Sequence, residues 1–267
     1  MKKLALTLFA ATALFSCKNE NKSAEDTNSE TEEMAMTADS TAMKAEFNIT
    51  PIEHATAVFD FGDTVFYIDP VGGAKAFEGE PIPGVILITD IHGDHLNEET
   101  LTAVADSTTT IFAPQAVVDA LKTDIKNSIT VIANGESKSW DGYTLTAIPM
   151  YNLREEAKQF HPKGRGNGYV LEKDGMRVYF SGDTEDIPEM RNLKDIDKAF
   201  VCMNLPYTMT VESAADGVIA FKPKEVYPYH FRGQDGLSDV EKFKGIVDSA
   251  NVGTEVMILD WYPNGAE

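Results

Sequence analysis

Four ionisable side chains follow directly on a short apolar run at residues 86–96, Ile-Leu-Ile-Thr-Asp-Ile-His-Gly-Asp-His-Leu. They are Asp90, His92, Asp94 and His95, and the chain has only five histidines in all. A buried strand would carry these groups to its C-terminal end, where Gly93 permits the bend that brings them together. Imidazole and carboxylate groups at this density suit Zn²⁺, Fe²⁺ or Mn²⁺. We therefore predict a metal site here rather than a polar loop of hydrogen-bonded histidines.

The elements that would position this segment alternate in type along the chain. Residues 47–61 and 63–70 are β-rich and flank a Gly-Asp turn, which indicates a hairpin, while 84–90 is typical of a strand buried on both faces. Further helical and extended segments alternate through 97–134 and 187–263, around a β-rich middle at 137–184. The pattern predicts an α+β fold of two mixed sheets with helices on the outer faces, one domain of about two hundred residues.

The first 17 residues read as an export signal. Two lysines precede the apolar stretch 4–15, which is shorter than the ~20 residues that span a bilayer. The ending Leu-Phe-Ser-Cys resembles a bacterial lipobox, so we predict cleavage before Cys17 and lipidation of that residue, with an ordinary signal peptide as the alternative. Residues 18–46 are acidic and poor in large apolar side chains, which predicts a disordered tether. The folded domain is then 47–267, exported and membrane-anchored on the periplasmic or cell-surface side.

Composition narrows the possible partners. The net charge of -20 repels nucleic acid and anionic headgroups, so we expect no nucleic-acid binding. The only other cysteine, Cys202, lies in an apolar strand-like segment and is interpreted as a core residue. If Cys17 is lipidated, no disulfide is available to the mature chain. The oligomeric state is left open.

Motifs downstream of the first segment carry a family resemblance. The pattern x-His-x-Asp-His at 91–95 resembles the His-x-His-x-Asp-His signature of the metallo-β-lactamase superfamily. Gly182-Asp183-Thr184 and His230 follow in the family's order, and residues 146–172 occupy the region of its third ligand. The closest branch resembles L-ascorbate-6-phosphate lactonase and N-acyl-phosphatidylethanolamine phospholipase D. The resemblance implies a four-layer αββα sandwich with two divalent metal ions at one edge, zinc first, with manganese or iron as alternatives.

The resemblance also implies a set of ligands. One site would consist of Asp90, His92 and His161, and the other of Asp94, His95 and His230, with Asp183 bridging them. Asp94 would also orient the attacking water and is the predicted catalytic residue.

The sequence departs from the family at two of these positions. Asp90 replaces the usual first histidine, which favours Mn²⁺ or Fe²⁺ or leaves one site weak or vacant. Asn152 stands where relatives have the third histidine, and we favour His161 instead because imidazole binds these metals better than an amide.

Three further residues are candidates for the rim of the site. His54 is expected on a strand, as a structural residue or one lining the site, and Tyr207 either contacts substrate or packs on its loop. Arg232, with Lys163 and Arg165, forms a basic cluster that either holds an anionic substrate or offsets nearby aspartates.

These features together predict a metal-dependent hydrolase that uses activated water on a small anionic ester or lactone. A phosphodiesterase acting on phospholipid or nucleotide-like substrates is the alternative within the same chemistry. A metal-binding module of the same fold without turnover is the alternative outside it.

Overall fold

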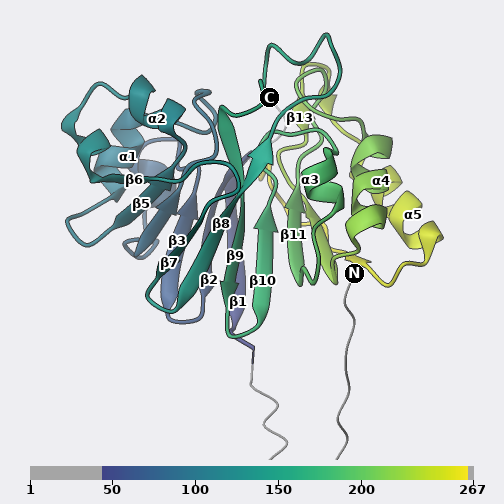
Figure 1. Cartoon of the computed structure of the whole chain (residues 1–267), viewed down its shortest axis with the longest axis horizontal. Helices are drawn as coiled ribbons and strands as arrows, with labels where there is room; N and C mark the ends of the chain where they lie inside the picture. Colours follow the sequence, from purple (N-terminus) through teal and green to yellow (C-terminus); the bar gives the residue numbers. More distant parts are fainter. Residues whose placement is uncertain (1–43, 264–267) are drawn as a thin grey trace, which may run out of the picture. The chain divides into compact units, whose positions relative to one another are not determined.

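The computed structural model describes residues 44–263 (Figure 1). The predicted signal peptide with Cys17, and the predicted tether up to residue 43, lie outside the described residues. Lys44 forms an ion pair with Asp197, and Ala45 is buried. The last residues assigned to the tether, 44–46, therefore already contact the domain.

Two sheets form the centre of this domain. The first has the spatial order β1 (Phe47–Glu53), β2 (Thr56–Phe61), β3 (Thr64–Ile68), β4 (Val85–Leu87), β5 (Thr110–Ala113) and β6 (Ile129–Val131). The second has the order β15 (Glu255–Val256), β12 (Glu225–Pro228), β11 (Lys198–Val201), β10 (Met176–Phe180), β9 (Gly166–Lys173), β8 (Tyr143–Met150) and β7 (Ser137–Trp140). A separate hairpin pairs β13 (Arg232–Gly233) with β14 (Gly236–Leu237).

The inner strands of the first sheet bury both of their faces. Phe59 on β2 and Phe66 on β3 point into the core between the sheets, whereas Val58 and Tyr67 belong to a second apolar cluster on the outer face. Across the interface Phe59 stacks on Phe180 of β10, with ring centroids 5.0 Å apart. The period-two alternation of two apolar sets explains why these segments read as nearly continuous apolar runs.

Helices cover the two outer faces. α1 (Glu98–Val104) and α2 (Gln115–Ala120) lie on the first sheet, with the single 3₁₀ turns η1 (Ala74–Phe77) and η2 (Asp124–Ser128) nearby. α3 (Pro188–Arg191), α4 (Val211–Phe221) and α5 (Val240–Ala250) lie on the second. Three of these helices begin at a side-chain cap, which is Asn97, Thr210 or Asp239. This arrangement confirms the predicted αββα sandwich.

Parallel pairing brings the strand ends that matter to one edge. β3 and β4 are parallel, and so are β10, β11 and β12. The C-terminal ends of parallel strands share an edge of their sheet, so the segments after them lie close together. Those segments include Asp69, the stretch 89–95, Asp183, Asn204 and His230.

The strand expected over 47–61 is in fact two strands. β1 and β2 pair antiparallel around a turn at His54, whose φ of 59° is left-handed. No glycine, asparagine or proline marks this turn, so no local pattern predicts it. His54 therefore lies in a turn and not on a strand as predicted. The last extended segment predicted within 187–263 is also reduced, to the two residues of β15.

Asp197, just before β11, links two neighbouring segments of the second sheet to the segment that precedes β1. Its carboxylate accepts hydrogen bonds from the backbone amide of Arg177 and from Lys224 and Lys44. Burial alone would raise the pKa of Asp197, but these donors outweigh it and hold that pKa below its usual value.

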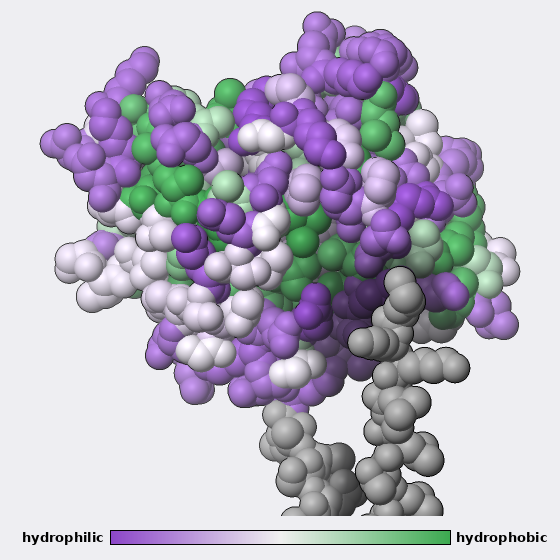
Figure 2. Space-filling view, in the orientation of Figure 1, coloured by the Kyte–Doolittle hydropathy of each residue, from purple (hydrophilic) through white to green (hydrophobic). Residues whose placement is uncertain are grey.

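Hydrophilic side chains are spread over the face seen in Figure 2, with smaller apolar areas between them. Within residues 44–263, no helix has the length and apolarity needed to cross a bilayer. The large apolar side chains most exposed to solvent are Ile82, Leu237, Leu153, Leu205 and Ile258.

Candidate metal centre

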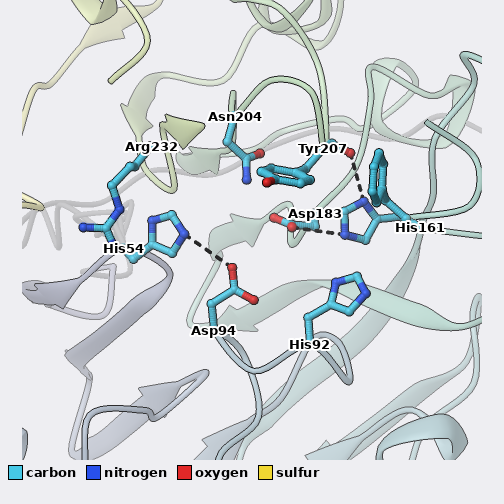
Figure 3. A pocket seen from close by; sticks show the side chains of 9 residues that line it. His54, His92, Asp94, His161, Asp183, Asn204, Tyr207 and Arg232 are labelled. Carbon is cyan, nitrogen blue, oxygen red and sulfur yellow. Dashed lines mark hydrogen bonds and ion pairs between the residues drawn. The ribbon is translucent and has the colours of Figure 1, made fainter. Parts of the chain in front are cut away.

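All five histidines of the chain meet at one edge of the sandwich. His54 comes from the β1–β2 turn, His92 and His95 from the segment after β4, His161 from the β8–β9 loop, and His230 from the end of β12. His54, His92 and His161 line one cavity, and the other two lie buried beside it (Figure 3). A convergence of five imidazoles from four separate segments of the chain is the arrangement that a metal centre requires.

One set of donor atoms has the spacing of a tetrahedral metal site. His95 Nε2 lies 3.1 Å from His230 Nε2 and 3.4 Å from Asp183 Oδ2, and Asp183 Oδ1 lies 3.2 Å from His230 Nε2. Ligands about 2.0–2.1 Å from a zinc ion in a tetrahedron are about 3.3 Å from one another. His95, Asp183 and His230 could therefore hold one divalent ion without rearrangement.

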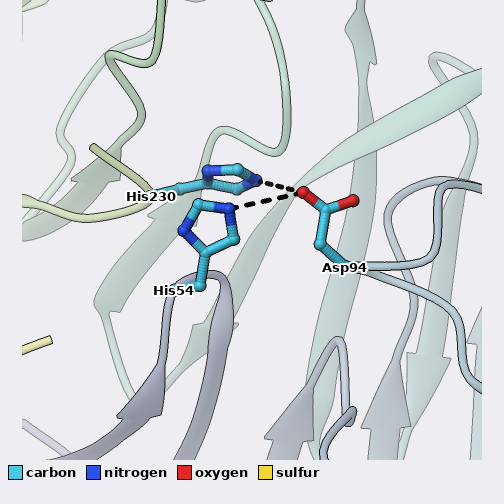
Figure 4. A group of neighbouring side chains, drawn as sticks. All are labelled: His54, Asp94 and His230. Atoms are coloured by element: carbon cyan, nitrogen blue, oxygen red, sulfur yellow. Dashed lines mark ion pairs between the residues drawn. The ribbon is translucent and has the colours of Figure 1, made fainter. Parts of the chain in front are cut away.

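Asp94 borders this set from the pocket side. Its Oδ2 lies 3.4 Å from both His230 Nε2 and His54 Nε2 (Figure 4), and its Oδ1 lies 3.9 Å from His95 Nε2. Burial raises the pKa of Asp94, but hydrogen bonds from His230 and His54 reverse this and hold that pKa far below its usual range. Asp94 is therefore ionised at neutral pH, and its side chain is 42% exposed, so it is accessible from the cavity.

The buried charges of the set stabilise one another. Burial lowers the pKa of His95, but the carboxylates of Asp183 and Asp69 raise it well above its usual value. Burial likewise raises the pKa of Asp183, and the charges of His230, His95 and His161 bring it well below normal. His95 is therefore protonated at neutral pH when no metal is bound, so a metal that binds its imidazole would displace a proton.

A buried carboxylate orients His95. Asp69 Oδ2 lies 2.8 Å from His95 Nδ1 and accepts from the Thr89 hydroxyl at 2.7 Å, while Asp69 Oδ1 accepts from the Thr89 amide at 2.7 Å. When His95 Nδ1 donates to Asp69, the lone pair of Nε2 faces His230 and Asp183. This carboxylate–imidazole pair is the arrangement that commonly supports histidine ligands of metals.

Two more contacts position the other imidazoles. The side-chain amide of Asn204 lies 3.1 Å from His230 Nδ1. His54 Nδ1 lies 2.8 Å from the hydroxyl of Tyr262, and its ring packs on His230 with centroids 3.8 Å apart. Burial, together with the charge of His230, lowers the pKa of His54 to about 4, so this imidazole is neutral at pH 7.

Two buried polar atoms without a hydrogen-bond partner in residues 44–263 indicate whether the site suits a metal. Among the described residues, His161 Nε2 and Asp183 Oδ1 have no hydrogen-bond partner, although both are buried. His161 Nδ1 lies 3.1 Å from the carbonyl oxygen of Tyr207, to which it can donate, and this leaves the lone pair of Nε2 available. Buried acceptors without donors are costly unless a cation or water satisfies them. Their presence fits a metal-binding site.

His161, and not Asn152, faces the site. His161 Nε2 lies 3.2 Å from Asp183 Oδ2. The amide of Asn152 instead donates to the carbonyl oxygens of Ala157 and Tyr207, which fixes the loop that carries His161.

The remaining predicted ligands form the other half of the site. The donor atoms of Asp90, His92 and His161 also lie close to one another, within 4.8 Å. Here, however, both oxygens of Asp90 accept from Arg165, at 2.9 Å from Nε and 2.6 Å from Nη2. The basic cluster is thus divided, because Lys163 pairs with Glu189 at the surface and Arg165 pairs with Asp90.

The cavity above these groups has a volume of about 340 Å³. Figure 3 shows Arg232 beside His54 on one side, His161 on the opposite side, and Asn204 and Tyr207 along a third. Tyr207 packs edge-on against Phe160, which also lines the cavity. All three residues predicted for the rim, His54, Tyr207 and Arg232, therefore lie in its wall.

Sequence reasoning missed Asp69, Asn204 as a partner of His230, and Tyr262. A signal for Asp69 was available, because it follows the apolar strand β3 just as Asp90 follows β4. Tyr262 had no such signal, since it reaches His54 from the far end of the chain.

Comparison with known proteins places this geometry in a family. Residues 48–230 match the family described as the β-lactamase superfamily domain. A UPF0173 metal-dependent hydrolase of Thermococcus onnurineus is 30% identical over 196 residues, covering 72% of this chain and 84% of the relative.

Solved structures agree with this assignment. A Parabacteroides distasonis protein assigned to the metal-dependent hydrolases has a TM-score of 0.71 and 37% identity, covering 80% of this chain and 93% of that chain. Igni18, a metallo hydrolase of Ignicoccus hospitalis, shares the fold with a TM-score of 0.66 and 20% identity, covering 79% and 94% of the two chains. The chain belongs to the β-lactamase superfamily and is a metal-dependent hydrolase of the metallo-β-lactamase fold.

Proposed function

We propose that this hydrolase cleaves a small anionic ester or lactone with a water molecule activated in the cavity. The observation that carries the proposal is the composition of that cavity, which is lined by Asp94 and Asp183 of the predicted metal ligands and by the guanidinium of Arg232. Its volume of about 340 Å³ is at the lower end for ligand pockets, which favours a small substrate.

Arg232 is the group that selects an anion in this proposal. Its guanidinium lies over the ring of Tyr262, 5.1 Å from the centroid, and Nη2 lies 3.4 Å from Glu53 Oε1. These contacts hold the side chain at the cavity wall while it remains 25% exposed. A carboxylate on the substrate could therefore contact this guanidinium while its scissile bond lies over the donors.

The reaction breaks one C–O bond and forms another. Water adds its oxygen to the carbonyl carbon, the ester or lactone C–O bond breaks, and the alkoxide oxygen leaves with a proton. A divalent ion held by His95, Asp183 and His230 would polarise the carbonyl and favour ionisation of the water. Asp94, ionised and open to the cavity, would accept a hydrogen bond from that water and orient it. Tyr207 borders the cavity and is the candidate donor to the developing oxyanion.

Zinc is the metal that we propose first. Two imidazoles and a carboxylate, with an open position toward the cavity, are the donors typical of catalytic zinc. Manganese or iron would use the same donors if zinc proves inactive.

The test compares matched substrates and two variants. A carboxylate-bearing lactone, its uncharged analogue and a phosphodiester are assayed with the zinc-loaded chain, with Asp94→Asn and with Arg232→Gln. We expect the charged lactone to be hydrolysed best and Asp94→Asn to lower kcat. Arg232→Gln should raise KM for the charged lactone about 10- to 100-fold, as loss of a charge-assisted hydrogen bond would, with little change for the uncharged analogue.

The outcomes separate the candidate substrate classes. Preference for the phosphodiester would replace the proposal with a phosphodiesterase, the alternative that a membrane location favours. Equal loss for the charged and uncharged lactones in Arg232→Gln would contradict the role of Arg232 in selecting an anion.

We also propose that the enzyme is exported and lipid-anchored. Support comes from the sequence of residues 1–17, with its basic start, short apolar stretch and terminal Leu-Phe-Ser-Cys. Expression in a bacterium fed labelled palmitate should label the wild-type chain in the membrane fraction and leave Cys17→Ser unlabelled. Equal labelling of both, or of neither, would refute lipidation at Cys17.

A further inference from the structure

The guanidinium of Arg165 contacts Asp90 and His92, two of the three ligands predicted for one of the metal sites. Arg165, immediately before β9, reaches across to Asp90, which follows β4. The Asp90 side chain is fully buried, and that of Arg165 is only 17% exposed. Nη2 also donates to the carbonyl oxygen of Phe160, which fixes the guanidinium from a second side. This is a buried, bidentate ion pair and not a surface contact.

The same guanidinium also lies within hydrogen-bond distance of the His92 imidazole. Arg165 Nη2 lies 3.2 Å from His92 Nε2, and His92 Nδ1 lies 3.1 Å from Asp90 Oδ2. Both contacts are satisfied together when His92 carries its proton on Nδ1, donates it to Asp90, and accepts from Arg165 on Nε2. The lone pair that would bind a metal is then already in use.

The donors left in this half are too few for a second ion. His161 Nε2 has no hydrogen-bond partner among the described residues, and Asp183 Oδ2 lies 3.2 Å away. Catalytic zinc sites use three protein ligands, and two donors beside a fixed positive charge fall short of that. By contrast, within residues 44–263 no lysine or arginine side chain pairs with His95, Asp183 or His230.

We infer that Arg165 is a built-in cation that replaces the second metal ion, so that the enzyme binds one divalent ion, at His95, Asp183 and His230. Asp90 in place of the family's first histidine is the matching change. A carboxylate pairs with a guanidinium through two hydrogen bonds, which an imidazole cannot do. Arg165 acts here as a positioning residue that neutralises Asp90 and orients His92. The inference concerns the number of ions and does not depend on the substrate proposed above.

The test counts metal ions directly. The full chain is stripped with a chelator, equilibrated with excess zinc, desalted and measured by inductively coupled plasma mass spectrometry. Arg165→Met removes the charge, and Arg165→Gln removes the charge but keeps a hydrogen-bond donor. Lys163→Met is the matched control, because it removes a cation two residues away that pairs with Glu189 outside the site.

We expect one ion per chain in the wild type and in Lys163→Met, and two in either Arg165 variant. The second ion would bind because Asp90, His92 and His161 become a free set of three donors. Two ions in the wild type would overturn the inference, as would a single ion in a folded Arg165 variant. If neither variant folds, the wild-type count decides, with one ion supporting the inference and two refuting it. A wild type that binds one ion but hydrolyses no ester would refute only the proposed substrate class.

Discussion

Replacing Asp69 with asparagine should weaken metal binding without touching a ligand. Asp69 Oδ1 accepts from the backbone amide of Thr89, so the amide oxygen of an asparagine would take that position. Its NH₂ group would then face His95 Nδ1, at the place where the carboxylate oxygen now lies 2.8 Å away. Two donors cannot face each other, so His95 would give up its Nδ1 proton and keep the proton on Nε2, the atom that faces His230 and Asp183.

The size of the effect follows from this change of tautomer. Zinc must displace the proton from Nε2 and leave Nδ1 protonated against a donor. Loss of such a supporting partner typically lowers metal affinity about 10- to 100-fold, which is about 1.4–2.8 kcal/mol. The metal-free fold should also lose stability, by about 3–5 kcal/mol, because removal of one partner of a buried ion pair leaves the other charge uncompensated. Asparagine also tolerates the left-handed φ of 45° found at position 69.

The assay is a competition for zinc between the chain and a chromophoric chelator, with urea unfolding of the metal-free proteins measured in parallel. Asp60→Asn is the control, because Asp60 is an exposed aspartate on the neighbouring strand β2. A dissociation constant for Asp69→Asn within twofold of the wild type, in a folded protein, would refute the proposed role of Asp69.

Three other predictions concern the scaffold. Asp197→Asn should lower the free energy of unfolding by about 1–3 kcal/mol at pH 7. This loss should shrink as the pH falls below 4, because a carboxylate with a lowered pKa stabilises the fold only while it is ionised. Asp195→Asn, at an exposed position, is the control, and an equal loss for Asp197→Asn at pH 3 and pH 7 would contradict this prediction. Gly168→Ala should lower the free energy of unfolding by about 1–3 kcal/mol, because the new Cβ would lie 2.7 Å from the carbonyl oxygen of Ser181. Gly245→Ala in α5 meets open space and should stabilise the protein by up to about 1 kcal/mol. Thermal unfolding measures both variants, and equal melting temperatures would contradict the close contact at Gly168. Cys202 is fully buried, and burial raises the pKa of its thiol to about 12. Iodoacetamide at pH 8 should therefore label Cys202 only after the protein unfolds, which peptide mass mapping would show. Rapid labelling of Cys202 in the native chain would contradict its burial.

Much of the fold was predictable because apolar periodicity reflects burial directly. The runs at 84–90 and 198–204 became the buried strands β4 and β11, and the hairpin at Gly62 formed as expected. The β1–β2 turn was not predictable, because His54 adopts a left-handed backbone conformation without any turn-forming residue. Tertiary contacts set that turn, among them the hydrogen bond between His54 and Tyr262.

The candidate site was predictable where its residues follow strands in sequence. Asp90 through His95, Asp183 and His230 all lie at strand ends, and their order matches the motifs of the family that the chain resembles, so the resemblance could place them together. Partners that approach from elsewhere were not. Whether Arg165 held an anionic substrate or offset an aspartate stayed open, because that depends on the path of the β8–β9 loop, which no local pattern encodes.

The central claim is that one metal centre is built from His95, Asp183 and His230. The most direct measurement is an anomalous difference map at the zinc absorption edge, from crystals of the full chain grown with zinc. We expect a peak about 2.0–2.2 Å from His95 Nε2, His230 Nε2 and an Asp183 oxygen. A second peak between His92 and His161 would refute the replacement of a metal by Arg165 but leave this centre standing. Zinc bound elsewhere, with no density at these three residues, would contradict the account.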